Sequence, residues 1–156
     1  MTQTQTHESH RSQDRELIVE REFEAPIQAV FDAFVDPEQL PKWWGPEDMT
    51  VPVCEMDVRE GGAWKTIMRA PNGNEHVVKG VYKTIEAPTR LAFTWAWQYE
   101  QGPGHETLVT VTLSDLGGRT RVRLEQRTFA EKEHRDNHVH GWESTLEALK
   151  KYLART

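Results

Sequence analysis

The segment RLAFTWAWQ, residues 90–98, alternates large apolar side chains with small or polar ones. The large side chains of one parity are Leu91, Phe93, Trp95 and Trp97. Successive side chains of a strand point to opposite faces of a sheet, so this segment predicts a strand with one strongly apolar face. A single strand cannot bury such a face alone, so the fold depends on what covers it.

Further strands are predicted on both sides of this segment. Short runs rich in valine, threonine and aromatic residues are separated by turn residues such as glycine, proline and asparagine. The predicted strands lie near residues 17–24, 50–58, 63–70, 76–86, 90–98, 106–115 and 119–127. This regular spacing is typical of an antiparallel sheet in which most consecutive strands pair.

Helices are predicted at two places along the chain. Pro26 suits the first turn of a short helix, and Asp36-Pro37 suits the start of a second one. Near the C-terminal end, between about 131 and 154, apolar residues recur at steps of three and four: Val139, Trp142, Leu146, Leu149 and Leu153. The order of elements predicts an α+β fold over residues 17–156, with the long helix against the apolar face of a curved antiparallel sheet of about seven strands.

Composition and charge exclude several classes of protein. Residues 1–16 are polar and are expected to form a disordered tail without the apolar core of a secretory signal. The formal net charge is −6, and the 19 basic residues are scattered along the chain, which argues against a nucleic-acid partner. No apolar run is long enough to cross a membrane. Cys54 is the only cysteine, so an intramolecular disulfide is excluded and a cytoplasmic location is expected.

Particular residues make the chain resemble the SRPBCC or START-like superfamily, which includes the birch-pollen allergen. Within it, the chain is similar to the bacterial family that resembles the C-terminal domain of the activator of the heat-shock-protein-90 ATPase. The motifs that carry the resemblance include Ala25-Pro26, Asp36-Pro37, Trp43-Trp44-Gly45, Gly61-Gly62, Pro71-Asn72-Gly73, Gly80-Val81-Tyr82 and Gly141-Trp142. The resemblance implies a helix-grip fold, in which the sheet wraps around the C-terminal helix. One departure is Gly117-Gly118-Arg119-Thr120, where members often show Gly-Gly-Thr; the longer turn affects only loop geometry.

A fold of this shape leaves a gap between helix and sheet that suits an apolar ligand. The chain has six tryptophans, which are large enough to form either a wide core or the wall of such a cavity. The predicted lining residues are Trp43, Trp44, Trp64, Met68, Tyr82, Phe93, Trp95, Trp97, Gln126, His138, Trp142, Thr145 and Leu146. For each of them ordinary core packing stays open as the alternative.

Binding of a small hydrophobic or aromatic molecule is therefore the leading hypothesis for function. The sequence has no nucleophile elbow, phosphate-binding loop or dinucleotide motif, so no catalytic residue and no cofactor is predicted. His134 and His138 lie one helical turn apart, but no third ligand accompanies them and no metal site is predicted. Two alternatives remain: a cyclase or lyase that uses His138 or His76 as acid or base, and a chaperone-associated or stress-response interaction domain. Whether the protein forms a homodimer or contacts a chaperone also stays open.

Overall fold

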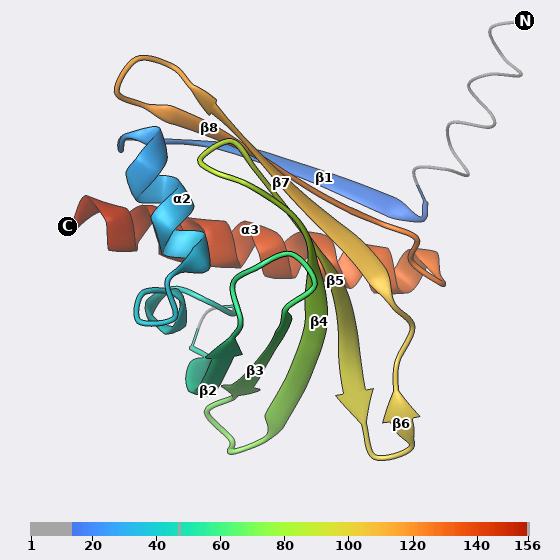
Figure 1. Cartoon of the computed structure of the whole chain (residues 1–156). Coiled ribbons are helices and arrows are strands. Elements are labelled where there is room, and N and C mark those ends of the chain that lie inside the picture. The colour runs from blue at the N-terminus through green and yellow to red at the C-terminus, as the bar shows by residue number, and fades with distance from the viewer. Residues whose placement is uncertain (1–13, 47, 156) are drawn as a thin grey trace, which may run out of the picture.

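The chain forms one antiparallel sheet of eight strands with a long helix packed across it, as the computed structural model shows for residues 14–46 and 48–155 (Figure 1). The strands are β1 (Glu16–Phe23), β2 (Thr50–Met56), β3 (Ala63–Arg69), β4 (Glu75–Glu86), β5 (Arg90–Tyr99), β6 (Gly102–Pro103), β7 (Thr107–Asp115) and β8 (Thr120–Arg127). They pair in the order β1-β8-β7-β5-β4-β3-β2, and β6 pairs only with β5. The predicted α+β helix-grip fold is confirmed, and the eighth strand is a two-residue segment in the predicted turn after 98.

Within the described residues, three helical elements complete the fold. They are α2 (Ile27–Val35), the 3-10 helix η1 (Leu40–Lys42) and the long α3 (Lys132–Ala154). The second of the two short helices predicted after β1 is thus only one turn long. Pro41 within this turn has no N–H to continue a hydrogen-bonded helix. The N–H groups of Trp43 and Trp44 both return to the carbonyl of Leu40, which closes the turn.

Irregular pairing bends the sheet at two places. The register between β4 and β5 shifts between Tyr82 and Thr84, and the register between β2 and β3 shifts between Thr50 and Val53. Such irregularities bend a strand and increase its twist. Figure 1 shows the resulting curvature of β4. The bend separates the β2–β4 part of the sheet from the nearly straight β1, β7 and β8.

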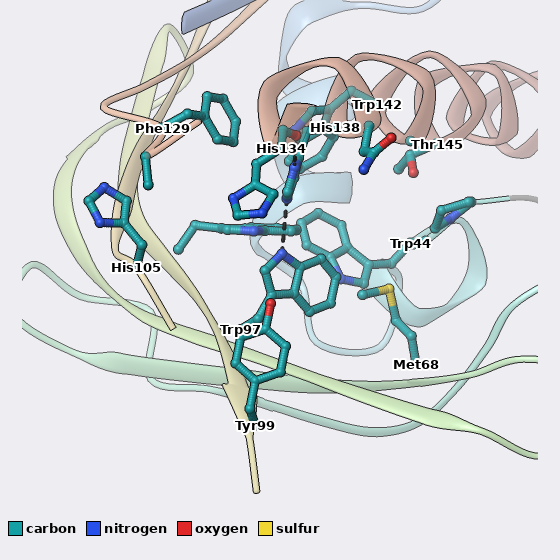
Figure 2. A pocket seen from close by; sticks show the side chains of 16 residues that line it. Trp44, Met68, Trp97, Tyr99, His105, Phe129, His134, His138, Trp142 and Thr145 are labelled. Atoms are coloured by element: carbon teal, nitrogen blue, oxygen red, sulfur yellow. Dashed lines mark hydrogen bonds between the residues drawn. The ribbon is translucent and has the colours of Figure 1, made fainter. Parts of the chain in front are cut away.

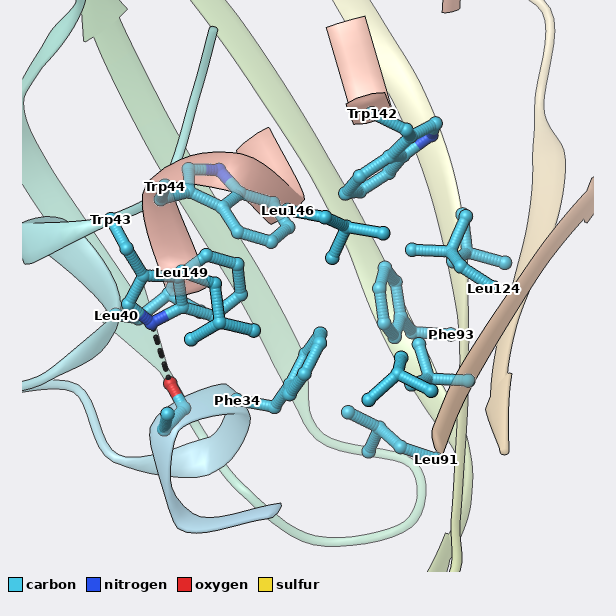
Figure 3. Close-up of a cluster of buried hydrophobic side chains, with 14 of the residues drawn as sticks. Phe34, Leu40, Trp43, Trp44, Leu91, Phe93, Leu124, Trp142, Leu146 and Leu149 are labelled. Atoms are coloured by element: carbon cyan, nitrogen blue, oxygen red, sulfur yellow. Dashed lines mark hydrogen bonds between the residues drawn. The ribbon is translucent and has the colours of Figure 1, made fainter. Parts of the chain in front are cut away.

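The face predicted from residues 90–98 is the buried one. Leu91, Phe93 and Trp95 are each less than a tenth exposed. Leu91 and Phe93 lie in one buried cluster with Trp142, Leu146 and Leu149 of α3 (Figure 3), and the Trp95 ring packs on that of Trp142. Two further contacts tie the ends of α3 to the rest of the fold. Near its C-terminal end, the Tyr152 hydroxyl donates to Gln39 Oε1 at 2.9 Å. Just before its N-terminal end, the Phe129 N–H donates to the Arg15 carbonyl.

Most of the predicted polar tail, residues 1–13, lies outside the described residues, and β1 begins at Glu16. In the described part of the chain, no helix is long and apolar enough to cross a membrane.

Candidate functional site

A cavity of about 350 Å³ lies between α3 and the sheet (Figure 2). Its wall comes from β3, β5, the loop after η1, the β6–β7 connection, the β8–α3 connection and the first half of α3. The lining residues are Trp44, Gly45, Pro46, Met68, Trp95, Trp97, Tyr99, His105, Phe129, Ala130, His134, Asn137, His138, Gly141, Trp142 and Thr145. None of these carries an ionised carboxylate, ammonium or guanidinium group.

The wall of the cavity divides into an apolar interior and a polar mouth. Trp44, Met68, Trp95, Phe129 and Trp142 are all buried and form the interior. The other part of the wall contains exposed polar side chains: Tyr99, which is 56% exposed, His105, His134 and Asn137. A molecule in this cavity would therefore meet mainly rings and a thioether inside, where Thr145 supplies a buried hydroxyl, and the other polar side chains near the solvent.

The indole N–H groups around the cavity are mostly bonded to the protein itself. Trp44 Nε1 donates to Thr66 Oγ1 at 3.2 Å, and Trp142 Nε1 donates to Gln126 Oε1 at 2.7 Å. Gln126 is fully buried, and its Nε2 continues the chain to Thr107 Oγ1 at 2.8 Å. These donors are satisfied within the wall, so they offer nothing to a ligand and leave the ring surfaces as the contact area.

Trp95 is the tryptophan at the centre of this wall. Its ring centroid lies 5.9 Å from that of Trp44, 5.5 Å from that of Trp97 and 5.1 Å from that of Trp142. Its indole N–H is buried and has no hydrogen-bond partner among the described residues. Tilted and edge-to-face contacts of this kind stabilise aromatic clusters beyond the area they bury.

His138 joins α3 to β5 across the cavity wall. Trp97 Nε1 donates to His138 Nε2 at 2.9 Å, and His138 Nδ1 lies 2.7 Å from the carbonyl of His134. Since Nε2 accepts the indole proton, the neutral ring must carry its own proton on Nδ1 and donate it to His134. Burial lowers the pKa of His138 below its ordinary value, and the bond to His134 opposes that effect. Both ring nitrogens are thus occupied, and neither is available to a bound molecule unless a hydrogen bond breaks.

One hydroxyl group inside the cavity is also unpartnered. Thr145 is 3% exposed and lines the cavity, yet no residue of the described chain hydrogen-bonds its hydroxyl. Figure 2 shows Thr145 on α3 on the same side of the cavity as Trp44 and Met68, with His105 on the other side.

The structure brings seven of the thirteen predicted lining residues together around this cavity: Trp44, Met68, Trp95, Trp97, His138, Trp142 and Thr145. Three others, Trp64, Tyr82 and Phe93, lie on the buried face nearer α2, where with Trp44 they surround a void of only about 20 Å³. The last three, Trp43, Gln126 and Leu146, pack in the core away from both spaces; Trp43 Nε1 donates to the Ala33 carbonyl at 3.1 Å. Strand parity identifies the buried face but not the distance of a residue from the cavity.

Nine lining residues were not predicted. His134, Asn137 and Gly141 share the helix face of His138 and Thr145, so helical spacing would have identified them. Tyr99 has the parity of Trp95 and Trp97. The others, Gly45, Pro46, His105, Phe129 and Ala130, lie in connections between elements, where periodicity gives no signal.

The remaining candidates for chemistry lie outside the cavity or are already bonded. His76 is exposed and does not line the cavity. The Cys54 thiol lies 3.5 Å from Met56 Sδ, and burial raises the pKa of this thiol. Within residues 14–46 and 48–155, no group of three His, Cys, Asp or Glu side chains is arranged to hold a metal ion.

Comparison with known proteins identifies relatives of this fold. Residues 24–154 match the family described as Activator of Hsp90 ATPase homolog 1-like protein. A crystal structure of the AHSA1 protein from Silicibacter pomeroyi is 31% identical, covers 89% of this chain and 97% of its own, and superposes with a TM-score of 0.81. A crystal structure from Chromobacterium violaceum is 28% identical, with 88% and 96% covered and a TM-score of 0.80.

A solution NMR structure from Arthrobacter aurescens is 26% identical, with 93% and 89% covered and a TM-score of 0.83. No curated protein matches the chain. The matched residues include β2–β8, α2 and α3, and therefore contain every element that contributes to the cavity. The chain therefore belongs to the Activator of Hsp90 ATPase homolog 1-like family.

Proposed function

We propose that the protein binds a small, uncharged, aromatic or apolar molecule in the cavity between α3 and the sheet. The observation that carries this proposal is the composition of the cavity wall. Its interior consists mainly of aromatic rings and Met68, with Thr145 as its buried hydroxyl, and the indole donors of Trp44, Trp97 and Trp142 are bonded within the protein. Such a wall favours apolar and stacking contacts over polar ones.

The size of the cavity supports a ligand of two or more fused rings. An apolar cavity of about 150 Å³ is enough to bind benzene, and typical ligand pockets begin at about 300 Å³. The space here is about 350 Å³. A charged ligand is disfavoured because burying an unpaired charge is far more costly than burying a neutral group.

Two other functions are less well supported by the geometry. For an enzyme, His138 would have to give up its bond to Trp97 or to His134 before it could accept or donate a proton, and His76 lies outside the cavity. For an interaction domain, a continuous exposed apolar patch is expected. The large apolar side chains exposed in the described chain are Ile18 on β1, Val58 after β2 and Tyr99 on β5, which belong to separate parts of the fold.

The proposal is tested by titrating the protein with naphthalene while recording tryptophan emission. We expect saturable quenching in the wild-type protein, because the ligand stacks against Trp44, Trp95 and Trp142. Native mass spectrometry of protein purified from its own host would identify a retained molecule. If naphthalene and related fused-ring compounds give no saturable change, the cavity is not a binding site for this class of molecule.

A further inference from the structure

We infer that the natural ligand carries an uncharged hydroxyl or carbonyl oxygen at its inner end and that Thr145 recognises this oxygen. The inference rests on the proposed function, since it concerns what the cavity selects. Its basis is the Thr145 hydroxyl, the one buried threonine hydroxyl of the described chain that the protein leaves unpaired.

The other buried threonine and glutamine side chains of the described chain all have partners. Thr66 accepts from Trp44, Thr94 accepts from the Val81 N–H, and Thr120 donates to the Ala25 carbonyl. Gln126 and Thr107 bond each other and are also bonded to Trp142 Nε1 and the Trp95 carbonyl. Thr145 is as deeply buried as these residues and lacks a partner. Leaving a buried hydroxyl unpaired is unfavourable, so a partner supplied by a ligand would be favoured.

The orientation of Thr145 makes its hydroxyl available to the cavity. A threonine within a helix can bond its hydroxyl to the carbonyl four residues earlier, which here belongs to Gly141. No such bond is present. The Thr145 hydroxyl oxygen also keeps some accessible surface, whereas the unbonded indole nitrogen of Trp95 is fully enclosed. It therefore borders the cavity and not the packed core.

The chemistry around Thr145 restricts the group that it can recognise. A threonine hydroxyl can donate to a carbonyl or hydroxyl oxygen and can also accept from a hydroxyl. No charged side chain lines the cavity, so a carboxylate or ammonium at this position would be buried without a counter-ion. Figure 2 shows Thr145 on the same side of the cavity as Trp44 and Met68, opposite the imidazole of His105. The recognised oxygen is thus at the inner end of the ligand, while groups at its outer end meet the polar mouth.

The experiment compares 2-naphthol with naphthalene in three proteins: wild type, Thr145→Val and Thr145→Ser. Valine replaces the hydroxyl with a methyl of similar size, and serine keeps the hydroxyl. We expect wild type and Thr145→Ser to bind 2-naphthol about threefold to tenfold more tightly than naphthalene, the effect of one net hydrogen bond. In Thr145→Val this preference should disappear, with naphthalene bound as tightly as by wild type. Thermal unfolding of each variant verifies that it is folded.

The possible outcomes distinguish recognition by Thr145 from the proposed function. If naphthalene binds to wild type but Thr145→Val keeps the full preference for 2-naphthol, recognition by Thr145 is wrong and the proposed function stands. If wild type shows no preference at all, recognition by Thr145 is equally wrong. If neither compound binds to wild type, the proposed function itself fails.

Discussion

Gly141 allows ligand binding and stability to be changed in opposite directions. It lies within α3 and lines the cavity, and a Cβ atom built on it would meet only Pro46 Cγ, at 3.9 Å. This is an ordinary van der Waals distance, so a side chain at 141 can extend toward the cavity without displacing the backbone. Leucine at this position should therefore occupy part of the 350 Å³ that we assign to the ligand.

The expected magnitudes follow from helix propensity and from overlap with the ligand. Gly141→Ala should raise the free energy of unfolding by about 1 kcal/mol, because glycine is that much less favourable than alanine within a helix. Gly141→Leu should keep most of this gain, since leucine has nearly the helix propensity of alanine. A ligand and the introduced leucine side chain together would overpack the cavity, so the affinity for the ligand should fall about tenfold or more.

The assay combines urea unfolding with naphthalene titration for wild type, Gly141→Ala and Gly141→Leu. Glu147→Leu is the matched control, because it introduces the same side chain on an exposed position of α3 that does not line the cavity. It should leave naphthalene affinity unchanged. A Gly141→Leu protein that is fully stable and binds naphthalene like wild type would refute the assignment of the ligand to this cavity.

Two further predictions concern polar contacts of the cavity wall. Trp142→Phe should lower the free energy of unfolding by about 1–3 kcal/mol in urea unfolding, because Gln126 Oε1 then loses its indole donor in a fully buried position; an unchanged value would contradict this bond. The pKa of His138 is lowered by burial. Between that pKa and the ordinary value of about 6.5, the folded protein therefore binds fewer protons than the unfolded chain. The free energy of unfolding should thus decrease as the pH falls through this window. His138→Gln keeps an acceptor for Trp97 and should reduce this loss of stability in unfolding measured from pH 7 to pH 5. His140→Gln, at an exposed position, should retain the loss.

Periodicity in the sequence predicted the faces of the elements but not every lining residue. The alternation of residues 90–98 and the stripe of α3 identified the two surfaces that meet in the core, because these patterns are local to one element. The bond between Trp97 and His138 joins residues 41 positions apart, and their register depends on how α3 lies across the sheet. Phe129 enters the wall from a connection without periodicity, so its place was not predictable from the sequence.

The tryptophan cluster has an optical consequence. Trp44, Trp64 and Trp95 have ring centroids 5.8–6.3 Å apart, and the planes of each pair are inclined at 47–82°. Indoles this close, held in a fixed and inclined geometry, couple their electronic transitions. Native protein should therefore give an intense near-ultraviolet circular dichroism spectrum that belongs to the cluster as a unit. Replacing any one of these rings should change the spectrum by more than the contribution of a single chromophore.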